Sequence, residues 1–194
     1  MFDDLIRDGD EMTGNGTAGR QQLLIVDGYN VLRSGQRYVH MQREEDYTHE
    51  TFNKVREALI SDVAAFAGTE YKAIIVFDAA DNPESAGKTE RIGGVKVKFS
   101  PYGSSADKVI EKLAHDAREN HLEVMVVTSD ATIQDTVFGG GVDRMSANGF
   151  SLEMEDLGDE AQRDRSIEVH RRATVAERIS PEMLAKLEAL RDGK

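Results

Sequence analysis

Three stretches of the chain are unbroken apolar runs that lead to an acid. Residues 23–27 read LLIVD, residues 72–78 read KAIIVFD, and residues 123–130 read EVMVVTSD. Strands buried on both faces of a parallel sheet show such continuous runs, whereas half-exposed strands alternate between apolar and polar residues. The pattern therefore predicts a parallel sheet with an aspartate at or beyond the carboxyl end of each strand.

Two other segments carry apolar residues at helical spacing. Residues 49–67 form the first, with Thr48 before it as an N-cap and Gly68 after it as a stop. The second begins after Ser104 or Ser105, either of which can cap a helix. Its buried stripe is predicted to be Val109, Ile110, Leu113 and Ala117. Strands that alternate with helices form βαβ units, so the chain is predicted to have an α/β fold.

The remaining elements are expected to be short. Residues 79–94 are polar and are interpreted as a loop, and VKVKF at 95–99 alternates as a strand with one basic face does. Residues 134–138 are expected to be helical and to end at three glycines. A last strand is expected at 142–146. Phe150 and Leu152 are expected to pack behind it.

Composition predicts one domain with extensions at both ends. A chain of 194 residues, 39% of them hydrophobic, is long enough for one sizeable core. Residues 1–22 are polar and glycine-rich and are interpreted as a flexible extension, 23–158 as the globular domain, and 159–194 as a charged helical tail. A helix is expected to begin near Ser180 and Pro181.

Cysteine content and hydropathy bear on the compartment. The chain has no cysteine, so it has neither disulfides nor a cysteine-ligated zinc site. The amino-terminal residues lack the basic and apolar regions of a signal peptide, and no stretch of about 18 apolar residues occurs. A soluble, cytoplasmic protein with no membrane contact is therefore expected.

The net charge of −12 argues against nonspecific binding of nucleic acids, because a bulk negative charge repels polyanions. Contact with RNA would require local basic residues, or metal ions held by the acids. The candidates in the loop and in the alternating strand are Lys88, Arg91, Lys96 and Lys98, and those in the tail are Arg171 and Arg172. The alternative interpretation is a solvated sheet edge and a solvated helix whose bases pair with nearby acids.

Four acids are predicted to meet at one edge of the sheet. Asp27, Asp78 and Asp130 follow the apolar strands, and Asp107 lies in the first turn of the second helix. One such acid can be a helix cap or complement a helix dipole. Four together need a cation, because two carboxylates about 5 Å apart at an effective dielectric of about 20 repel by roughly 3 kcal/mol. Carboxylate oxygens favour Mg²⁺ or Mn²⁺ over zinc.

The order and spacing of these motifs resemble a known family. LLIVDGYN, IIVFDAA, GVKVKFSPYGSSADKVIEKL, VMVVTSD and VFGGG, in that order, look like the NYN domain of the PIN-like nuclease superfamily. The similarity is greatest to the YacP-like branch, which includes a bacterial ribosome-associated endoribonuclease that cuts mRNA in the ribosomal A site. The resemblance implies a three-layer α/β/α fold with a central, mainly parallel sheet and an acidic metal site.

The resemblance also implies roles for individual residues. Asp27, Asp107 and Asp130 match the acids that bind metal, and Asp78 matches the acid that ends the second strand. Three further residues are expected to support the site: Asn30, which matches the amide of DGYN, Glu111, which matches the second acid of SADxxIE, and Ser129 beside Asp130.

The leading hypothesis is a single-strand-selective, metal-dependent endoribonuclease that acts on mRNA in association with the ribosome. The alternative is a noncatalytic RNA- or ribosome-binding module with the same fold. A phosphatase of the haloacid dehalogenase type is disfavoured because Tyr29 occupies the position of its second aspartate. A dinucleotide-binding enzyme is disfavoured because no glycine-rich turn follows the first strand.

Overall fold

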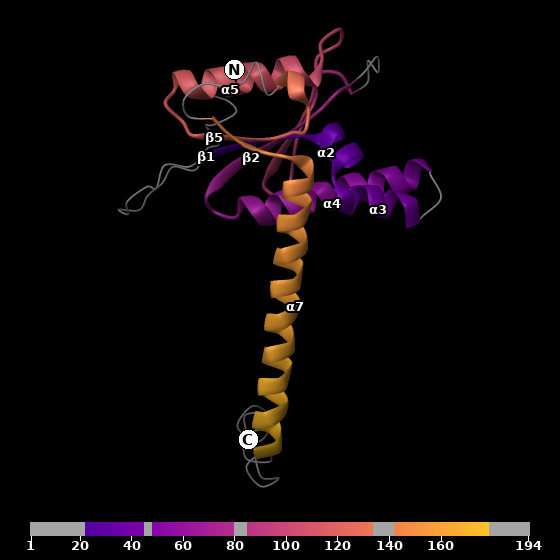
Figure 1. Cartoon of the computed structure of the whole chain (residues 1–194), viewed down its shortest axis with the longest axis vertical. Coiled ribbons are helices and arrows are strands. Elements are labelled where there is room, and N and C mark those ends of the chain that lie inside the picture. The colour runs from indigo at the N-terminus through magenta and orange to yellow at the C-terminus, as the bar shows by residue number, and fades with distance from the viewer. Residues whose placement is uncertain (1–21, 45–47, 80–84, 134–141, 179–194) are drawn as a thin grey trace, which may run out of the picture. The chain divides into compact units, whose positions relative to one another are not determined.

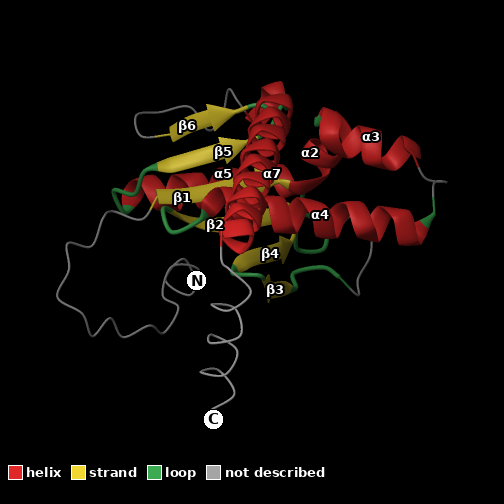
Figure 2. Ribbon diagram, turned by 90° about the horizontal axis from the view of Figure 1, so that it is seen from below, coloured by secondary structure: helices red, strands yellow, loops and turns green. Residues whose placement is uncertain are grey.

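The computed structural model describes residues 22–44, 48–79, 85–133 and 142–178. Its centre is a six-stranded sheet with the order β3-β4-β2-β1-β5-β6 (Figure 2). The strands are β1 (Gln22–Asp27), β2 (Tyr71–Phe77), β3 (Thr89–Ile92), β4 (Val95–Phe99), β5 (Val124–Val127) and β6 (Val142–Met145). Every pairing is parallel except that of β3 with β4. The predicted mainly parallel sheet is confirmed.

Helices cover both faces of this sheet. They are α2 (Gly28–Ser34), α3 (Gln36–Glu44), α4 (His49–Ala67), α5 (Ala106–Glu119) and α7 (Ala147–Arg178). Alternate residues of β1 point to opposite faces, so Leu24 and Val26 join the core under α4 while Leu23 and Ile25 join the core under α5. Figure 1 shows α5 on one side of the sheet and α2, α3 and α4 on the other. The three-layer α/β/α prediction is confirmed.

The two predicted helices begin where their capping residues indicate. The Thr48 hydroxyl accepts a hydrogen bond from Thr51 N at 3.1 Å, and the backbone of Gly68, with φ of 49°, ends α4. Ser105 caps α5 by accepting from Lys108 N at 3.4 Å. The capping residues Thr48, Gly68 and Ser105 are visible in the sequence, so the ends of α4 and the start of α5 could be predicted.

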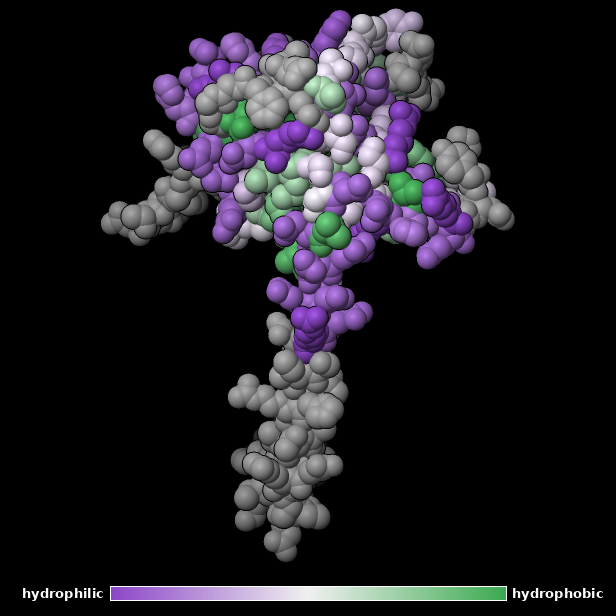
Figure 3. Space-filling model, in the orientation of Figure 1, coloured by the Kyte–Doolittle hydropathy of each residue, from purple (hydrophilic) through white to green (hydrophobic). Residues whose placement is uncertain are grey.

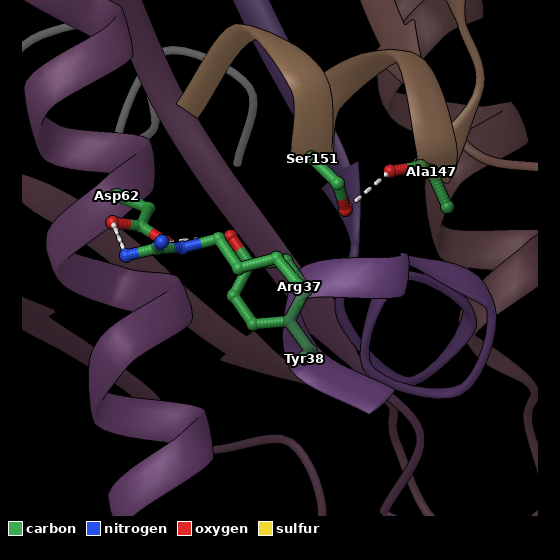
Figure 4. A network of polar contacts seen from close by, with 5 residues as sticks. All are labelled: Arg37, Tyr38, Asp62, Ala147 and Ser151. Carbon is green, nitrogen blue, oxygen red and sulfur yellow. Dashed lines mark hydrogen bonds and ion pairs between the residues drawn. The ribbon is translucent and has the colours of Figure 1, made fainter. Parts of the chain in front are cut away.

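A buried polar contact joins α3 to α4 (Figure 4). The Tyr38 hydroxyl, fully buried, donates to Asp62 Oδ2 at 2.9 Å, and Arg37 Nε donates to the same oxygen at 2.8 Å. The same figure shows the Ser151 hydroxyl donating to the Ala147 carbonyl within α7, at 3.0 Å. Because the Asp62 carboxylate accepts from both partners, it holds α3 against α4.

Three predictions about local structure need correction. The region interpreted as a loop, 79–94, contains strand β3, which pairs with β4 across a turn at Gly93 and Gly94, whose φ angles are 58° and 85°. Residues 28–44, for which no element was predicted, form α2 and α3. Phe150 is buried as predicted, but the Leu152 side chain is exposed. The helices predicted at 134–138 and after Pro181 lie outside the described residues.

The chain divides into two compact units after Met154. The sheet and the first two turns of α7 belong to the first unit, and the rest of α7 belongs to the second. Of the helices that the structure describes, none is long and apolar enough to cross a membrane. On the face shown in Figure 3 hydrophilic side chains dominate, and apolar residues form small separate patches.

Candidate functional site

The strand order brings three of the predicted acids to neighbouring positions. Strands β2, β1 and β5 are adjacent and parallel, so Asp27, which ends β1, lies at the same edge of the sheet as Asp78 and Asp130, which follow β2 and β5. Strand β4 is parallel to β2 and leads into α5, whose first turn carries Asp107 at that edge. The charges of Asp107 and Asp130 contribute to the raised pKa of Asp27, and those of Asp130 and Asp78 contribute to the raised pKa of Asp107, so these acids lie near one another.

Asp27 is the most deeply buried of the four, with 6% of its surface exposed. Its Oδ1 accepts from Asn30 N at 3.3 Å and its Oδ2 accepts from the Thr128 hydroxyl at 3.2 Å. Burial raises the pKa of Asp27 to about 6; the two hydrogen bonds oppose the shift, and the charges of Asp107 and Asp130 add to it. Asp27 is both the N-cap of α2 and the innermost acid of the cluster.

Asp107 titrates under the influence of the other acids. Partial burial raises its pKa, and the nearby carboxylates of Asp130, Glu111 and Asp78 raise it further. Glu111 lies one helical turn along α5, on the same side as Asp107. A site that raises the pKa of its acids in this way would be stabilised by a bound cation.

A short chain of hydrogen bonds positions the loop that carries Asp130. The Asn30 side-chain oxygen accepts from Ser129 N at 2.8 Å, and the Thr128 hydroxyl accepts from Asp130 N at 3.1 Å. The Ser129 hydroxyl accepts from Ala147 N at 3.0 Å, at the start of α7. Asn30 and Ser129, both predicted as supporting residues, are thus bonded to each other.

Asp78 is held by a serine that the sequence analysis did not select. The Ser100 hydroxyl, fully buried, donates to Asp78 Oδ1 at 3.0 Å and accepts from Ala79 N at 2.9 Å. Ser100 follows β4 directly, at the same edge as the aspartates that follow β1 and β2. That position was the signal that could have identified it. Thr128, one residue beyond β5, was missed in the same way.

The acidic side chains at this edge have the donor atoms that a divalent cation prefers, but their present positions do not form a set of ligands. Among the described residues no group of three or more His, Cys, Asp or Glu side chains is arranged to hold a metal ion. The donors are nevertheless carboxylates whose charges raise the pKa of Asp27 and of Asp107, and hard oxygen donors are those that Mg²⁺ and Mn²⁺ prefer. Asp27, Asp107 and Asp130 would hold such an ion.

The predicted basic residues fall into two groups. Lys96 and Lys98 lie on β4, Arg91 lies opposite Lys96 on β3, and Lys88 is the exposed residue before β3. These four belong to the same unit as the acids. Arg171 and Arg172 lie on the part of α7 that belongs to the second unit.

Comparison with known proteins identifies the family. The model of the YacP-like NYN domain matches residues 24–192, which is most of the chain. The chain belongs to the YacP-like NYN family. Its nuclease-type fold is therefore shared with that family, and the predicted resemblance is confirmed.

Individual relatives of this YacP-like NYN protein agree with the family match. The protein of Bacillus subtilis (strain 168) called "Uncharacterized protein YacP" is 30% identical over 178 residues, covering 88% of this chain and 97% of the relative. The crystal structure of Rae1 (YacP) from Bacillus subtilis matches with a TM-score of 0.60 at 29% identity, covering 89% of this chain and 95% of that one. A tryptophan-to-leucine mutant of Rae1 matches with a TM-score of 0.58 at 30% identity, covering 76% and 83%.

Proposed function

We propose that this YacP-like NYN protein is a metal-dependent endoribonuclease that hydrolyses phosphodiester bonds in single-stranded RNA, with mRNA on the ribosome as its physiological substrate. The observation that carries the proposal is the gathering of carboxylates at one edge of the sheet, where the charges of Asp107 and Asp130 raise the pKa of the buried Asp27. Acids whose pKa is raised by burial and by neighbouring acids are typical of functional sites.

Each residue of the site would have its own role. Asp27, Asp107 and Asp130 would hold Mg²⁺ or Mn²⁺. A bound divalent ion supplies charge neutralisation for a phosphate and a bound water of lowered pKa. Asn30 fixes the loop that carries Asp130 through the hydrogen bond from Ser129 N. Ser100 orients the Asp78 carboxylate.

The proposal is tested by incubating the protein with an unstructured RNA in Mg²⁺, in Mn²⁺ and in excess chelator. Wild-type protein should cleave only with the ion. Asp27→Asn and Asp107→Asn should each abolish most cleavage, whereas Asp143→Asn, which removes an exposed acid from β6, should leave it unchanged. Equal cleavage by wild type and both site variants would refute the assignment of the site.

A second candidate function is a noncatalytic RNA- or ribosome-binding module. It is favoured by one observation, that the acids in the described part of the chain are not arranged as a ligand set. Under this alternative wild-type protein would cleave no RNA with either ion, and Asp107→Asn would sediment with ribosomes as wild type does. Ion-dependent cleavage by the wild-type protein would exclude it.

A further inference from the structure

An exposed tyrosine stands in the loop that leads to Asp107. Pro101 to Ser104 form a turn, closed by a hydrogen bond of 3.0 Å from Ser104 N to the Pro101 carbonyl, with Gly103 at a φ of 72°. Tyr102 occupies the second position of this turn, and 67% of its surface is exposed. Removing a large aromatic ring from water is favourable. An exposed ring such as that of Tyr102 can therefore contribute to the binding of a partner.

The loop is held firmly at both ends. Ser100 N donates to the Phe77 carbonyl at 2.9 Å, which extends the pairing of β4 with β2 up to the loop. At the other end Ser105 caps α5, two residues before Asp107. The backbone of the loop that carries Tyr102 is thus anchored at the acidic edge before any partner binds, and such preorganisation lowers the entropic cost of binding.

Three lysines gather beside this loop, on the face of the sheet that α5 covers. Lys98 is in register with Val76, whose side chain belongs to the core under α5, so Lys96 and Lys98 point to that face. Burial lowers the pKa of Lys98, and the charges of Lys96 and Lys112 lower it further, which places Lys112 of α5 near Lys98. Positive charge gathered in this way favours an anionic partner.

The positive strip formed by Lys96, Lys98 and Lys112 is a local feature of a strongly acidic chain. The whole protein carries a net charge of −12, so a polyanion would be repelled over most of the surface. A nucleic acid would therefore be drawn to the lysines between β4 and α5. Single strands combine phosphate contacts with stacking of bases on aromatic rings, and Tyr102 lies between Lys98 and Asp107 along the chain.

We propose that Tyr102 is a stacking platform for one base of a single-stranded RNA whose adjacent phosphates contact Lys98 and Lys112. The inference rests on the proposed nuclease function, because it places the strand beside the acids that would act on it. It predicts preference for unpaired RNA, since a base within a duplex cannot stack on the ring. It also assigns a phosphate contact to Lys112 of α5, which the sequence did not indicate, in addition to the basic residues of β4.

Binding in chelator tests this inference separately from cleavage. A fluorescently labelled, unstructured RNA of about twelve nucleotides is titrated with full-length protein, and the dissociation constant is measured at several salt concentrations. Tyr102→Ala should weaken binding about tenfold, and Tyr102→Phe, which keeps the ring, should bind within about twofold of wild type. Lys98→Gln and Lys112→Gln should each reduce the slope of log affinity against log salt by about 0.7.

Lys54→Gln serves as the matched control, because Lys54 is an exposed lysine on α4, on the opposite face of the sheet. It should leave the salt dependence unchanged. Binding by Tyr102→Ala that equals that of wild type would overturn the inference, as would an effect of the same size on duplex RNA. Wild-type protein that cleaves no RNA while Tyr102 still governs binding would refute the proposed nuclease and retain the strand-binding site.

Discussion

The raised pKa of Asp27 has a consequence for stability that can be measured without RNA. The carboxyl titrates at about 6 in the folded protein and near its ordinary value of 3.8 in the unfolded chain. The folded state therefore binds this proton more tightly, and the contribution to stability is fully present below pH 4 and is lost as the pH rises through 6. The difference amounts to roughly 3 kcal/mol of destabilisation at pH 7.

Asp27→Asn should remove this cost. Asparagine keeps an oxygen that can accept from Asn30 N, but its amide cannot accept from the Thr128 hydroxyl, and that loss costs about 1 kcal/mol. In chelator at pH 7 the variant should therefore be about 2 kcal/mol more stable than wild type. Near pH 4 the advantage should disappear, because the wild-type carboxyl is then largely protonated.

Urea denaturation from pH 4 to pH 8 measures the difference in the free energy of unfolding, provided that the m-values agree. Asp143→Asn controls for the removal of one negative charge at an exposed position. An Asp27→Asn variant that is less stable than wild type at pH 7, or one whose difference from wild type is the same at every pH, would refute the reasoning. Added Mg²⁺ should raise the stability of wild type more than that of the variant, because only wild type keeps the Asp27 carboxylate.

Three further substitutions test the scaffold around the site. Asn30→Ala should lower RNA cleavage roughly 10- to 100-fold by releasing the loop of Asp130, with Mg²⁺ affinity measured in parallel; unchanged cleavage would contradict the positioning role. Tyr38→Phe should cost roughly 1–2 kcal/mol in urea denaturation through its lost buried hydrogen bond, without changing cleavage. Gly28→Ala should cost about 1–3 kcal/mol because the new Cβ would collide with the Phe77 ring, and a variant as stable as wild type would refute this packing argument.

The parallel core of the fold could be predicted because its strands carry an unambiguous pattern. An unbroken apolar run can only be buried on both faces, and β1, β2 and β5 lie where those runs occur. Strand β3 was missed because all of its residues are exposed, so hydropathy carries no signal there. The pair Gly93 and Gly94 was the available indication, since two successive residues with positive φ form the hairpin turn that joins β3 to β4.

The candidate site could likewise be predicted only in part from the sequence. An acid at the end of a buried strand is visible in the sequence, and the edge position of Asp27, Asp78 and Asp130 followed from that rule alone. The residues that hold these acids are Ser and Thr, which are too common in loops to stand out. The hydrogen bond from Ser100 to Asp78 joins residues 22 positions apart, so the position of Ser100 directly after β4 was the only indication of it in the sequence.

Ser129 is hydrogen-bonded both to Asn30 of α2 and to Ala147, the first residue of α7. Its amide is bound by Asn30 and its hydroxyl by the first residue of α7, while Asp130 follows directly in the chain. The first turn of α7 and the loop that carries Asp130 are therefore mechanically linked. A tilt of the first turn of that helix would have to break the bond between Ala147 N and the Ser129 hydroxyl or carry the acid along with it.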